Sequence, residues 1–399
     1  MTLFAHVELA PRDPILGLNE QFATDANPGK VNLGVGMYYD ENGKLPLLAC
    51  VAQAEQVMAK VPASRGYLPI DGIAAYDRAV QTLVFGAASP EVASGCIATV
   101  QALGGTGALK LAADFLHRLD PKAKVLISDP SWENHRALFT EAGFEVRSYP
   151  YYDAATRGVN LDGMLEALRA APRGSIVVLH ACCHNPTGAD IASDDWPRVI
   201  ETVRTAGLVP VLDMAYQGFG DGIDADGDAV RRFAQAGAPL FVATSFSKSF
   251  SLYGERVGAL SVLCASKDEA QRVLSQLKIV IRTNYSNPPT HGASVVTQVL
   301  NTPELRAQWE GELAAMRERI KSMRAALVAE LSAAGVERDM GFVTAQRGMF
   351  SYSGLSAAQM QRLRAEFSIY GVDSGRICVA ALNRGNIGRV AKAMAAVMR

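Results

Sequence analysis

The chain has 399 residues, of which 49% are apolar and 20% are charged, and its formal net charge is −1. This length and composition favour a soluble globular enzyme of two or more domains, and a nearly neutral chain is unlike the basic proteins that bind nucleic acid or anionic membranes. No apolar run reaches the ~18 residues that a membrane span needs, and residues 1–20 lack the basic start and apolar core of a signal peptide.

Strand-like and helix-like segments alternate through the middle of the chain, a pattern typical of layered α/β folds. The expected strands are short and apolar on both faces, as in a sheet covered by helices, and lie at Ile97–Gln101, Lys124–Ser128, Ser175–His180, Val209–Asp213, Phe241–Ser245 and Val257–Cys264. Helices are expected from the spacing of apolar residues at Ala108–Leu119, Asp194–Ala206 and Asp268–Arg282.

A long helix is expected to begin at Thr302-Pro303 and to run to about Ala334, because a hydroxyl N-cap followed by proline is a strong helix start. Ser356 is expected to cap a helix that ends near Phe367. Two further strands are expected in the C-terminal part, at Met349–Tyr352 and Arg376–Ala380. No disordered linker separates these parts, so we expect the domains to pack together.

The cysteines are scattered along the chain, at Cys50, Cys96, Cys182, Cys183, Cys264 and Cys378. This scatter disfavours a disulfide framework and is typical of a reducing cytoplasm. We expect no metal at Cys182-Cys183-His184, because neighbouring residues on a strand point to opposite faces and no second Cys/His pair completes a tetrahedral site.

The turn from Ser245 to Arg256 follows an apolar strand and carries Lys248 among several hydroxyl side chains. A lysine that holds an aldehyde cofactor needs a rigid position such as a strand end, and the hydroxyls with Arg256 suit a phosphate dianion. The ordinary alternative is a surface lysine in a polar loop, because Ser-x-Ser-Lys occurs in unrelated proteins.

A glycine-rich turn, Gly104–Gly107, lies between an expected strand and an expected helix. Free N–H groups at a helix N-terminus bind anions, so this turn is a second candidate phosphate site. A dinucleotide fingerprint is the alternative, but the G-x-G-x-x-G spacing is missing, since residues 105, 107 and 110 are Gly, Gly and Lys.

Two more motifs lie in register with these, and together the four resemble the pyridoxal-phosphate site of class I, fold-type I aminotransferases from about Pro11 to the C-terminus. The four motifs are Gly104-Gly105-Thr106-Gly107, His184-Asn185-Pro186-Thr187-Gly188, Asp213-Met214-Ala215-Tyr216 and Ser245-Phe246-Ser247-Lys248. The resemblance implies a mostly parallel seven-stranded sheet between helices and a smaller α/β domain built from both termini. We expect a large cofactor-binding domain at 45–313, and a small domain with an N-terminal arm at 1–44 and 314–399.

The resemblance also implies the roles of the catalytic residues. Lys248 would bind the cofactor aldehyde and, once freed, move the substrate's α-proton, for which its pKa must be lowered by burial and nearby positive charge. Asp213 would pair with the protonated ring nitrogen and keep the ring an electron sink, although a strand-end aspartate alone is more often a turn former or a helix cap. Tyr216 and Asn185 would donate hydrogen bonds to the cofactor's phenolic oxygen.

The same resemblance assigns the remaining cofactor contacts. Trp132 would stack on the ring, with His135 behind Asp213; the alternative for Trp132 is a core aromatic. The cofactor phosphate would be bound by Gly104, Gly105, Thr106, Ser245, Arg256 and, from the neighbouring subunit, Tyr67.

Substrate binding is assigned to residues far apart in the sequence. Arg376 lies in an apolar strand, where an arginine is odd unless it meets a carboxylate, and it would bind the substrate α-carboxylate. Arg282 would bind a side-chain carboxylate across the interface of a homodimer with shared active sites. An exposed arginine and a packed loop tyrosine are the ordinary alternatives for Arg282 and Tyr67. Further substrate contacts are assigned to Gly36, Trp132 and Asn185.

Within the family, the chain resembles the aromatic-amino-acid branch most and the aspartate branch next. Ser251–Arg256, Tyr38–Glu41 and Tyr67–Pro69 resemble the aromatic branch, whereas Asn287 resembles the aspartate branch. The implied reaction is a ping-pong transfer of the amino group from tyrosine or phenylalanine to 2-oxoglutarate, with aspartate aminotransferase as the alternative. Leu16 and Val35 are expected to line the apolar wall of the pocket.

Two other classes of protein are weaker alternatives. A regulator with an aminotransferase-like sensor domain would need an appended DNA-binding domain, for which the N-terminus is too short and not basic. A nucleotide-binding α/β protein is disfavoured by the missing glycine spacing. The visible absorption of bound cofactor would distinguish the enzyme from both.

Overall fold

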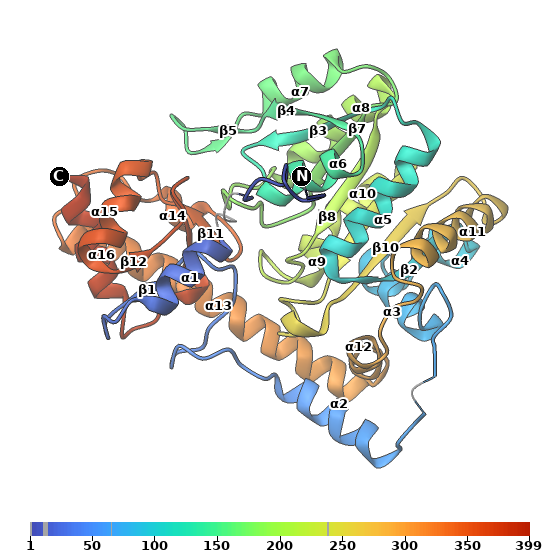
Figure 1. Ribbon diagram of the computed structural model, residues 1–399, viewed down its shortest axis with the longest axis horizontal. Helices are drawn as coiled ribbons and strands as arrows, with labels where there is room; N and C mark the ends of the chain where they lie inside the picture. Colours follow the sequence, from blue (N-terminus) through green and yellow to red (C-terminus); the bar gives the residue numbers. More distant parts are fainter. Residues whose placement is uncertain (1, 11–14, 65, 238) are drawn as a thin grey trace.

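The computed structural model describes residues 2–10, 15–64, 66–237 and 239–399, with the backbone alone for Leu16. Its centre is a seven-stranded sheet with the order β2-β10-β9-β8-β7-β3-β4, in which only β10 runs antiparallel to its neighbours (Figure 1). The strands are β2 (Ile97–Leu103), β3 (Lys124–Asp129), β4 (Glu145–Pro150), β7 (Ile176–His180), β8 (Val209–Met214), β9 (Leu240–Ser245) and β10 (Val257–Leu263). The expected mostly parallel α/β sheet is therefore confirmed.

Alternate residues of each strand belong to two different hydrophobic cores, which explains why the strands are apolar on both faces. On one face the core forms with α5 (Gly104–Leu119), α6 (Glu133–Glu141) and α11 (Lys267–Asn284). The other face packs against α3 (Ala74–Phe85), α7 (Leu161–Ala170), α8 (Trp196–Ala206), α10 (Asp228–Gln235) and α12 (His291–Asn301). Smaller elements beside the sheet are α4 (Pro90–Ser94), α9 (Ile223–Asp226) and the two-stranded pair of β5 (Tyr152–Asp153) with β6 (Gly158–Val159).

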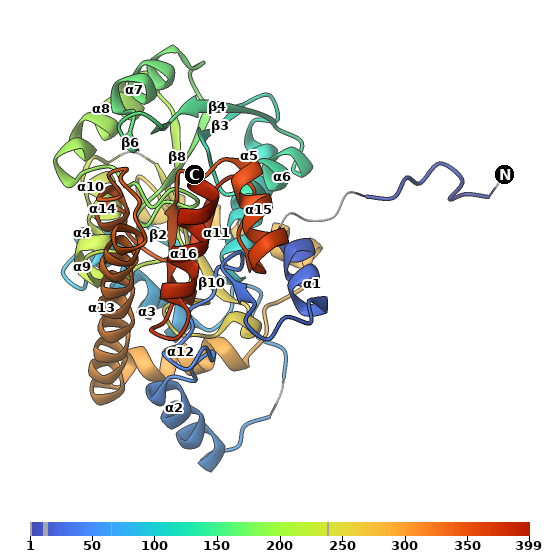
Figure 2. The same ribbon diagram turned by 90° about the vertical axis from the view of Figure 1, so that its left-hand side faces the viewer.

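The N- and C-terminal segments build a second, smaller α/β unit. Strand β1 (Val31–Asn32) pairs in parallel with β12 (Ile369–Tyr370), and β11 (Phe350–Tyr352) pairs antiparallel with β13 (Arg376–Cys378). The unit's helices are α1 (Leu16–Thr24), α14 (Phe342–Ala345), α15 (Ala357–Phe367) and α16 (Ile387–Met398). The long helix α13 (Pro303–Ala333) runs from α2 (Ala49–Lys60) and α12 to this unit (Figure 1). Residues 2–10 extend away from the rest of the chain (Figure 2).

Several element ends differ from the predictions for local reasons. Helix α5 begins at Gly104 rather than Ala108, so the glycine motif is the first turn of the helix. Residues 193–195 form a 3₁₀ turn, and α8 begins only at Trp196, with Pro197 in its first turn. Strand β13 ends at Cys378, because Val379 N and Ala380 N turn to donate to the carbonyl of Met349.

The two predicted N-caps have different outcomes. Ser356 forms a capping box with Gln359, as its position predicted, and α15 ends at Phe367. Helix α13 begins at Pro303 as predicted, but the prediction of a hydroxyl cap at Thr302 was wrong. The Thr302 hydroxyl instead accepts a hydrogen bond from the Gln298 side chain at 3.0 Å.

Candidate active site

A cavity of about 170 Å³ opens where parallel strands end and the smaller unit approaches the sheet. The carboxyl ends of β7, β8 and β9 meet at this edge, where α/β proteins commonly bind ligands. The cavity is lined by Ile15, Gly36, Gly105, Thr106, Trp132, His180, Asn185, Asp213, Ala215, Tyr216, Ser245, Ser247, Lys248, Arg256, Phe350 and Arg376. In the described part of the chain, every predicted site residue lines it except Gly104, Tyr67 and Arg282.

Lys248 lies just beyond β9, with its amine in the cavity. Burial lowers the pKa of this amine to about 8; the Asp213 carboxylate opposes the shift and Arg256 adds to it. The Lys248 Nζ lies 5.3 Å from the centre of the Tyr216 ring. A substantial fraction of the amine is therefore neutral, and nucleophilic, near neutral pH.

Asp213 is the next-to-last residue of β8; it lies beside His180 of β7 and is held from behind by His135. The Asp213 Oδ2 and the His135 Nε2 are 2.9 Å apart, and the His135 Nδ1 is 2.9 Å from the Ser131 hydroxyl. Burial raises the pKa of Asp213, but the hydrogen bond to His135 and the charges of His135, His180 and Lys248 outweigh it and leave this pKa below its ordinary value. The carboxylate therefore remains ionised and available to a cation in the cavity.

The first turn of α5 and the hydroxyl-rich turn after β9 form a pocket for an anion. Gly105 and Thr106 face Ser245, Ser247 and Arg256 across the cavity. Gly104 belongs to this pocket although it does not line it, because a Cβ at this position would come within 2.6 Å of Arg256 Nη2. Arg256 has a φ of 54°, unusual for a residue with a side chain, and donates to Tyr253 O at 2.9 Å and more weakly to the Ser247 hydroxyl at 3.4 Å.

These groups match pyridoxal phosphate by chemistry. A neutral lysine amine suits an aldehyde, a buried carboxylate suits a protonated ring nitrogen, and the pocket at the start of α5 suits a phosphate. Glycine at position 104 leaves Arg256 the room that this last contact needs. The cavity residues therefore fit the cofactor that the motifs predicted.

Arg376 is 1% exposed and has one unused donor. Its Nη1 donates to Asn185 Oδ1 at 3.1 Å and its Nη2 to Gly34 O at 2.8 Å. Its Nε has no hydrogen-bond partner among the described residues. The guanidinium lies 4.4 Å from the centre of the Phe350 ring, and the edge of Tyr216 meets the same ring. A buried cation with a free donor suits a substrate carboxylate.

Tyr67 and Arg282 lie on the surface, away from the cavity of their own chain. Tyr67 is 95% exposed in the loop after α2. Arg282 is exposed near the end of α11 and donates to the Ser286 hydroxyl. The structure of one chain therefore brings neither residue to the predicted site.

Five residues that line the cavity were not assigned from the sequence: Ile15, His180, Ala215, Ser247 and Phe350. His180 pairs with Asp213 across two neighbouring strands, which could not be seen because strand order was not predicted. Ser247 could have been found, because it lies inside the lysine motif. Of the expected apolar wall, Val35 does not line the cavity and the Leu16 side chain lies outside the described ones; Ile15 and Phe350 line it instead.

The argument that Cys182 and Cys183 cannot converge was wrong. Strand β7 ends at His180, and Cys183 has a φ of 53°, so both thiols approach the Asp226 carboxylate, with all three ligand atoms within 4.8 Å of one another. The carboxylate already accepts three backbone N–H bonds. A second group of this kind consists of His135, His180 and Asp213, of which His180 and Asp213 line the cavity.

Comparison with known proteins agrees with this fold and with the predicted cofactor. Residues 28–394 match the family model of class I and II aminotransferases, so the chain belongs to that family and is a pyridoxal-phosphate-dependent aminotransferase. It is 64% identical to the aspartate aminotransferase of Pseudomonas aeruginosa, over 100% of both chains. It is 52% identical to the aromatic-amino-acid aminotransferase of Escherichia coli, over 99% of this chain and 100% of that one.

A solved structure is similar over the whole length. The aromatic-amino-acid aminotransferase of Burkholderia pseudomallei, covalently bound to pyridoxal phosphate, is 65% identical, with a TM-score of 0.98 and 100% coverage of both chains. No described helix is both long and apolar enough to cross a membrane.

Proposed function

We propose that this aminotransferase moves the amino group of tyrosine and phenylalanine to 2-oxoglutarate and also accepts aspartate. The single observation that carries the proposal is the position of the two substrate arginines. Arg376 lies in the cavity with Phe350 against it, whereas Arg282 is exposed on α11 and free of any acidic partner among the described residues. An arginine outside the cavity wall can pair with a dicarboxylate or move away from an aromatic ring.

Aspartate aminotransferase is the second candidate. The relative at 64% identity carries that name, whereas the relative at 52% and the structure at 65% are aromatic-amino-acid aminotransferases. Both activities use the same α-carboxylate site, so they differ only in what the pocket accepts beyond Arg376.

In this mechanism the bound cofactor supplies the electron sink that stabilises the substrate's α-carbanion. Arg376 holds the α-carboxylate, which orients the α-hydrogen. The Lys248 Nζ takes that proton as general base and later returns it as general acid. Asp213 and Trp132 would hold the ring in place, and Tyr216 and Asn185 would donate to its phenolic oxygen.

The test is a panel of amino donors in single-turnover half-reactions with the purified holoenzyme. We expect tyrosine, phenylalanine and aspartate all to convert the cofactor to its amine form. Conversion by aspartate and glutamate alone would favour aspartate aminotransferase instead.

We further propose a homodimer in which Tyr67 and Arg282 act in the partner's active site. Exposed apolar side chains on the N-terminal arm and around α2 and α11 support an interface there: Leu3, Phe4, Val7, Leu9, Leu47, Val57, Val61 and Ile279. Sedimentation of the purified protein tests this proposal, and a monomer would contradict it.

The domain division at 45–313 against 1–44 and 314–399 stays a prediction, and so does a cytoplasmic location. The pairing of β1 with β12 supports a unit built from both termini. The six free cysteines are compatible with a reducing compartment.

A further inference from the structure

Two loops at the carboxyl edge of the sheet bring Asn185 and Tyr216 to the cavity. One follows β7 and the other follows β8, so neither side chain is placed by a helix or a strand. Each loop instead folds around a carboxylate outside the cavity. Asp190 serves the first loop, and Asp226, the last residue of α9, serves the second.

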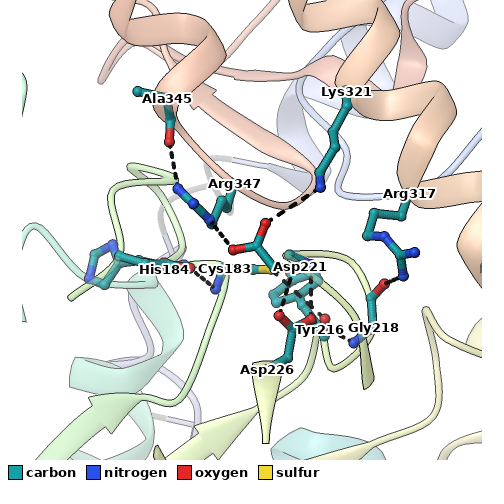
Figure 3. A network of polar contacts seen from close by, with 12 residues as sticks. Cys183, His184, Tyr216, Gly218, Asp221, Asp226, Arg317, Lys321, Ala345 and Arg347 are labelled. Atoms are coloured by element: carbon teal, nitrogen blue, oxygen red, sulfur yellow. Dashed lines mark hydrogen bonds and ion pairs between the residues drawn. The ribbon is translucent and has the colours of Figure 1, made fainter. Parts of the chain in front are cut away.

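Asp226 organises the backbone that follows Tyr216 (Figure 3). Its Oδ2 accepts from Gly218 N at 2.7 Å and Gly220 N at 2.9 Å, and its Oδ1 accepts from Asp221 N at 2.9 Å. The turn begins at Tyr216 itself, whose carbonyl accepts from Phe219 N at 3.0 Å. Gly218, the third residue of this four-residue turn, has a φ of 95°. A positive φ at this position is typical of a type II turn and favours glycine. The carboxylate therefore fixes the turn on which the Tyr216 ring stands.

Asp190 does the same for the residues before Asn185. Its Oδ2 accepts from Cys183 N and its Oδ1 from His184 N, both at 2.7 Å. The His184 ring is locked between the hydroxyls of Ser128 and Thr187, at 3.0 and 2.8 Å. Asn185 is the next residue, so its amide is presented from a backbone with little freedom.

The surrounding protein disfavours the charged form of both carboxyl groups. Burial raises the pKa of Asp226, and the three backbone N–H groups act against the rise. Burial by the surrounding protein raises the pKa of the partly exposed Asp190 to about 6, against its two N–H groups, with the Asp226 charge adding to the rise. A carboxylate enclosed by protein is costly unless hydrogen bonds compensate it, and these two accept five backbone N–H bonds between them.

The two loops also touch each other and the smaller unit. Cys183 Sγ lies 3.8 Å from Tyr216 O. The backbone N of Arg347 donates to Gly188 O at 2.7 Å in the first loop. The Nε of Arg347 donates to Asp221 Oδ2 at 2.6 Å in the second loop (Figure 3), so Arg347 joins one loop to the other.

We propose that Asp226 and Asp190 are positioning residues, each serving one hydrogen-bond donor to the cofactor: Asp226 places Tyr216 and Asp190 places Asn185. The inference rests on the proposed roles of Tyr216 and Asn185. Neither carboxylate lines the cavity that holds the reacting atoms, so each acts only through its loop.

The Asp226→Asn and Asp190→Asn variants test this with almost no change in volume. An amide has one accepting oxygen where the carboxylate has two, so at least one backbone N–H in each loop loses its acceptor. Asp221→Asn is the matched control, because it removes the ion pairs to Arg347 and Lys321 from the same loop but leaves the Asp221 N–H bound to Asp226.

The readout is the pH titration of the holoenzyme's visible absorption band. This band reports whether the Lys248 nitrogen that is joined to the cofactor carries a proton. Losing this proton leaves a negative charge on the phenolic oxygen, so donors to that oxygen favour the deprotonated form. Weaker donation should therefore raise the midpoint. A hydrogen bond of ordinary net strength corresponds to a shift of about 0.5–1 pH unit.

We expect Asp226→Asn to raise the midpoint in the wild-type background and to add nothing in a Tyr216→Phe background. Asp190→Asn should raise the midpoint with Tyr216→Phe present but add nothing to Asn185→Ala. Asp221→Asn should leave it unchanged. If Asp226→Asn does not fold, Asp226→Glu takes its place, because it displaces both oxygens by one methylene. Its midpoint is then compared in the wild-type and Tyr216→Phe backgrounds in the same way.

Two results would overturn the inference in different ways. An unchanged midpoint in Tyr216→Phe and Asn185→Ala themselves would refute the proposed cofactor contacts, and the positioning role with them. Shifted midpoints in those variants, together with Asp226→Asn shifts that persist in Tyr216→Phe, would leave the contacts standing and refute positioning alone.

Discussion

The residues that line the cavity around Lys248 come from both units of this chain, whereas Tyr67 and Arg282 lie on the surface of the same chain, away from the cavity. At the cofactor end, Asp213 and Arg256 act in opposite directions on the pKa of Lys248, and His135 holds Asp213. The substrate end offers Arg376 and Phe350 but no second cation for a side-chain carboxylate among the described lining residues. In the proposed homodimer, each chain therefore supplies its own catalytic groups, whereas the partner would add Tyr67 at the cofactor phosphate and Arg282 for discrimination between substrates.

The largest effect should come from removing the amine at the cofactor end. Lys248→Ala loses both the covalent anchor and the proton carrier, so turnover should fall by more than the ~10²–10⁴-fold that proton transfer alone contributes. Lys267→Ala, at the start of α11, is the control and should keep its activity. Borohydride reduction of the wild-type holoenzyme and peptide mapping should label Lys248, and a label on another lysine would contradict the assignment.

The second-largest loss of activity should come from Asp213→Ala, and it should fall mainly on kcat. The buried ring nitrogen then lacks a partner, and breaking one side of a buried pair costs ~3–5 kcal/mol, or about 10²–10³-fold or more. Asp213→Glu keeps the charge and should retain more activity. Rapid-reaction kinetics would measure this, and a near-native kcat in Asp213→Ala would mean that the cofactor is oriented differently.

Variants of the two arginines should affect different sets of substrates. Arg376→Leu should damage all donors alike, because each has an α-carboxylate. Arg282→Leu should lower kcat/KM for aspartate and 2-oxoglutarate by about 10²–10³-fold, through the same loss of a buried charge partner. Phenylalanine has no second charge and should lose far less. Equal losses for aspartate and phenylalanine in Arg282→Leu half-reactions would refute an aromatic preference with two binding modes.

A smaller effect should appear in the pH dependence of cofactor uptake by the apoenzyme. Only the neutral Lys248 amine reacts, and its pKa is lowered to about 8. The neutral fraction rises with pH, so the rate at which the visible band forms should grow about tenfold per pH unit below 8 and level off above it. A rate that still rises steeply at pH 10 would show an ordinary lysine.

The cofactor end could be predicted from the sequence because its residues stand in short motifs at strand ends. The lysine turn, the glycine turn and Asp213 with Tyr216 each keep their local geometry wherever the strands are placed. His180 and Phe350 could not be found this way, because their position depends on strand order and on packing between units. The edge strand β4 was also missed, because its residues are mostly exposed and lack the apolar pattern of its neighbours.

The residues assigned to the neighbouring subunit's site were predictable only by resemblance, since neither Tyr67 nor Arg282 stands in a sequence pattern that indicates what it binds. The Cys182-Cys183 error has a local cause. A single residue in the left-handed region, Cys183, reverses the alternation that strand geometry imposes. Such a turn depends on Asp190, which binds the Cys183 N–H from outside the motif.

The sharing of active sites is tested most directly by mixing Lys248→Ala with Arg282→Leu subunits. In a hybrid dimer with two-fold symmetry, one site keeps Lys248 from one subunit and Arg282 from the other. At equal mixing, half of the dimers are hybrids with one intact site, so aspartate turnover should recover to about a quarter of the wild-type value. The double variant mixed with wild-type chains is the control: its hybrids contain no intact shared site, so activity should fall on subunit exchange from about one half to about a quarter of the wild-type value, the share that the wild-type dimers supply. No recovery, with subunit exchange confirmed by mass, would show that Arg282 acts in its own chain and would contradict the account.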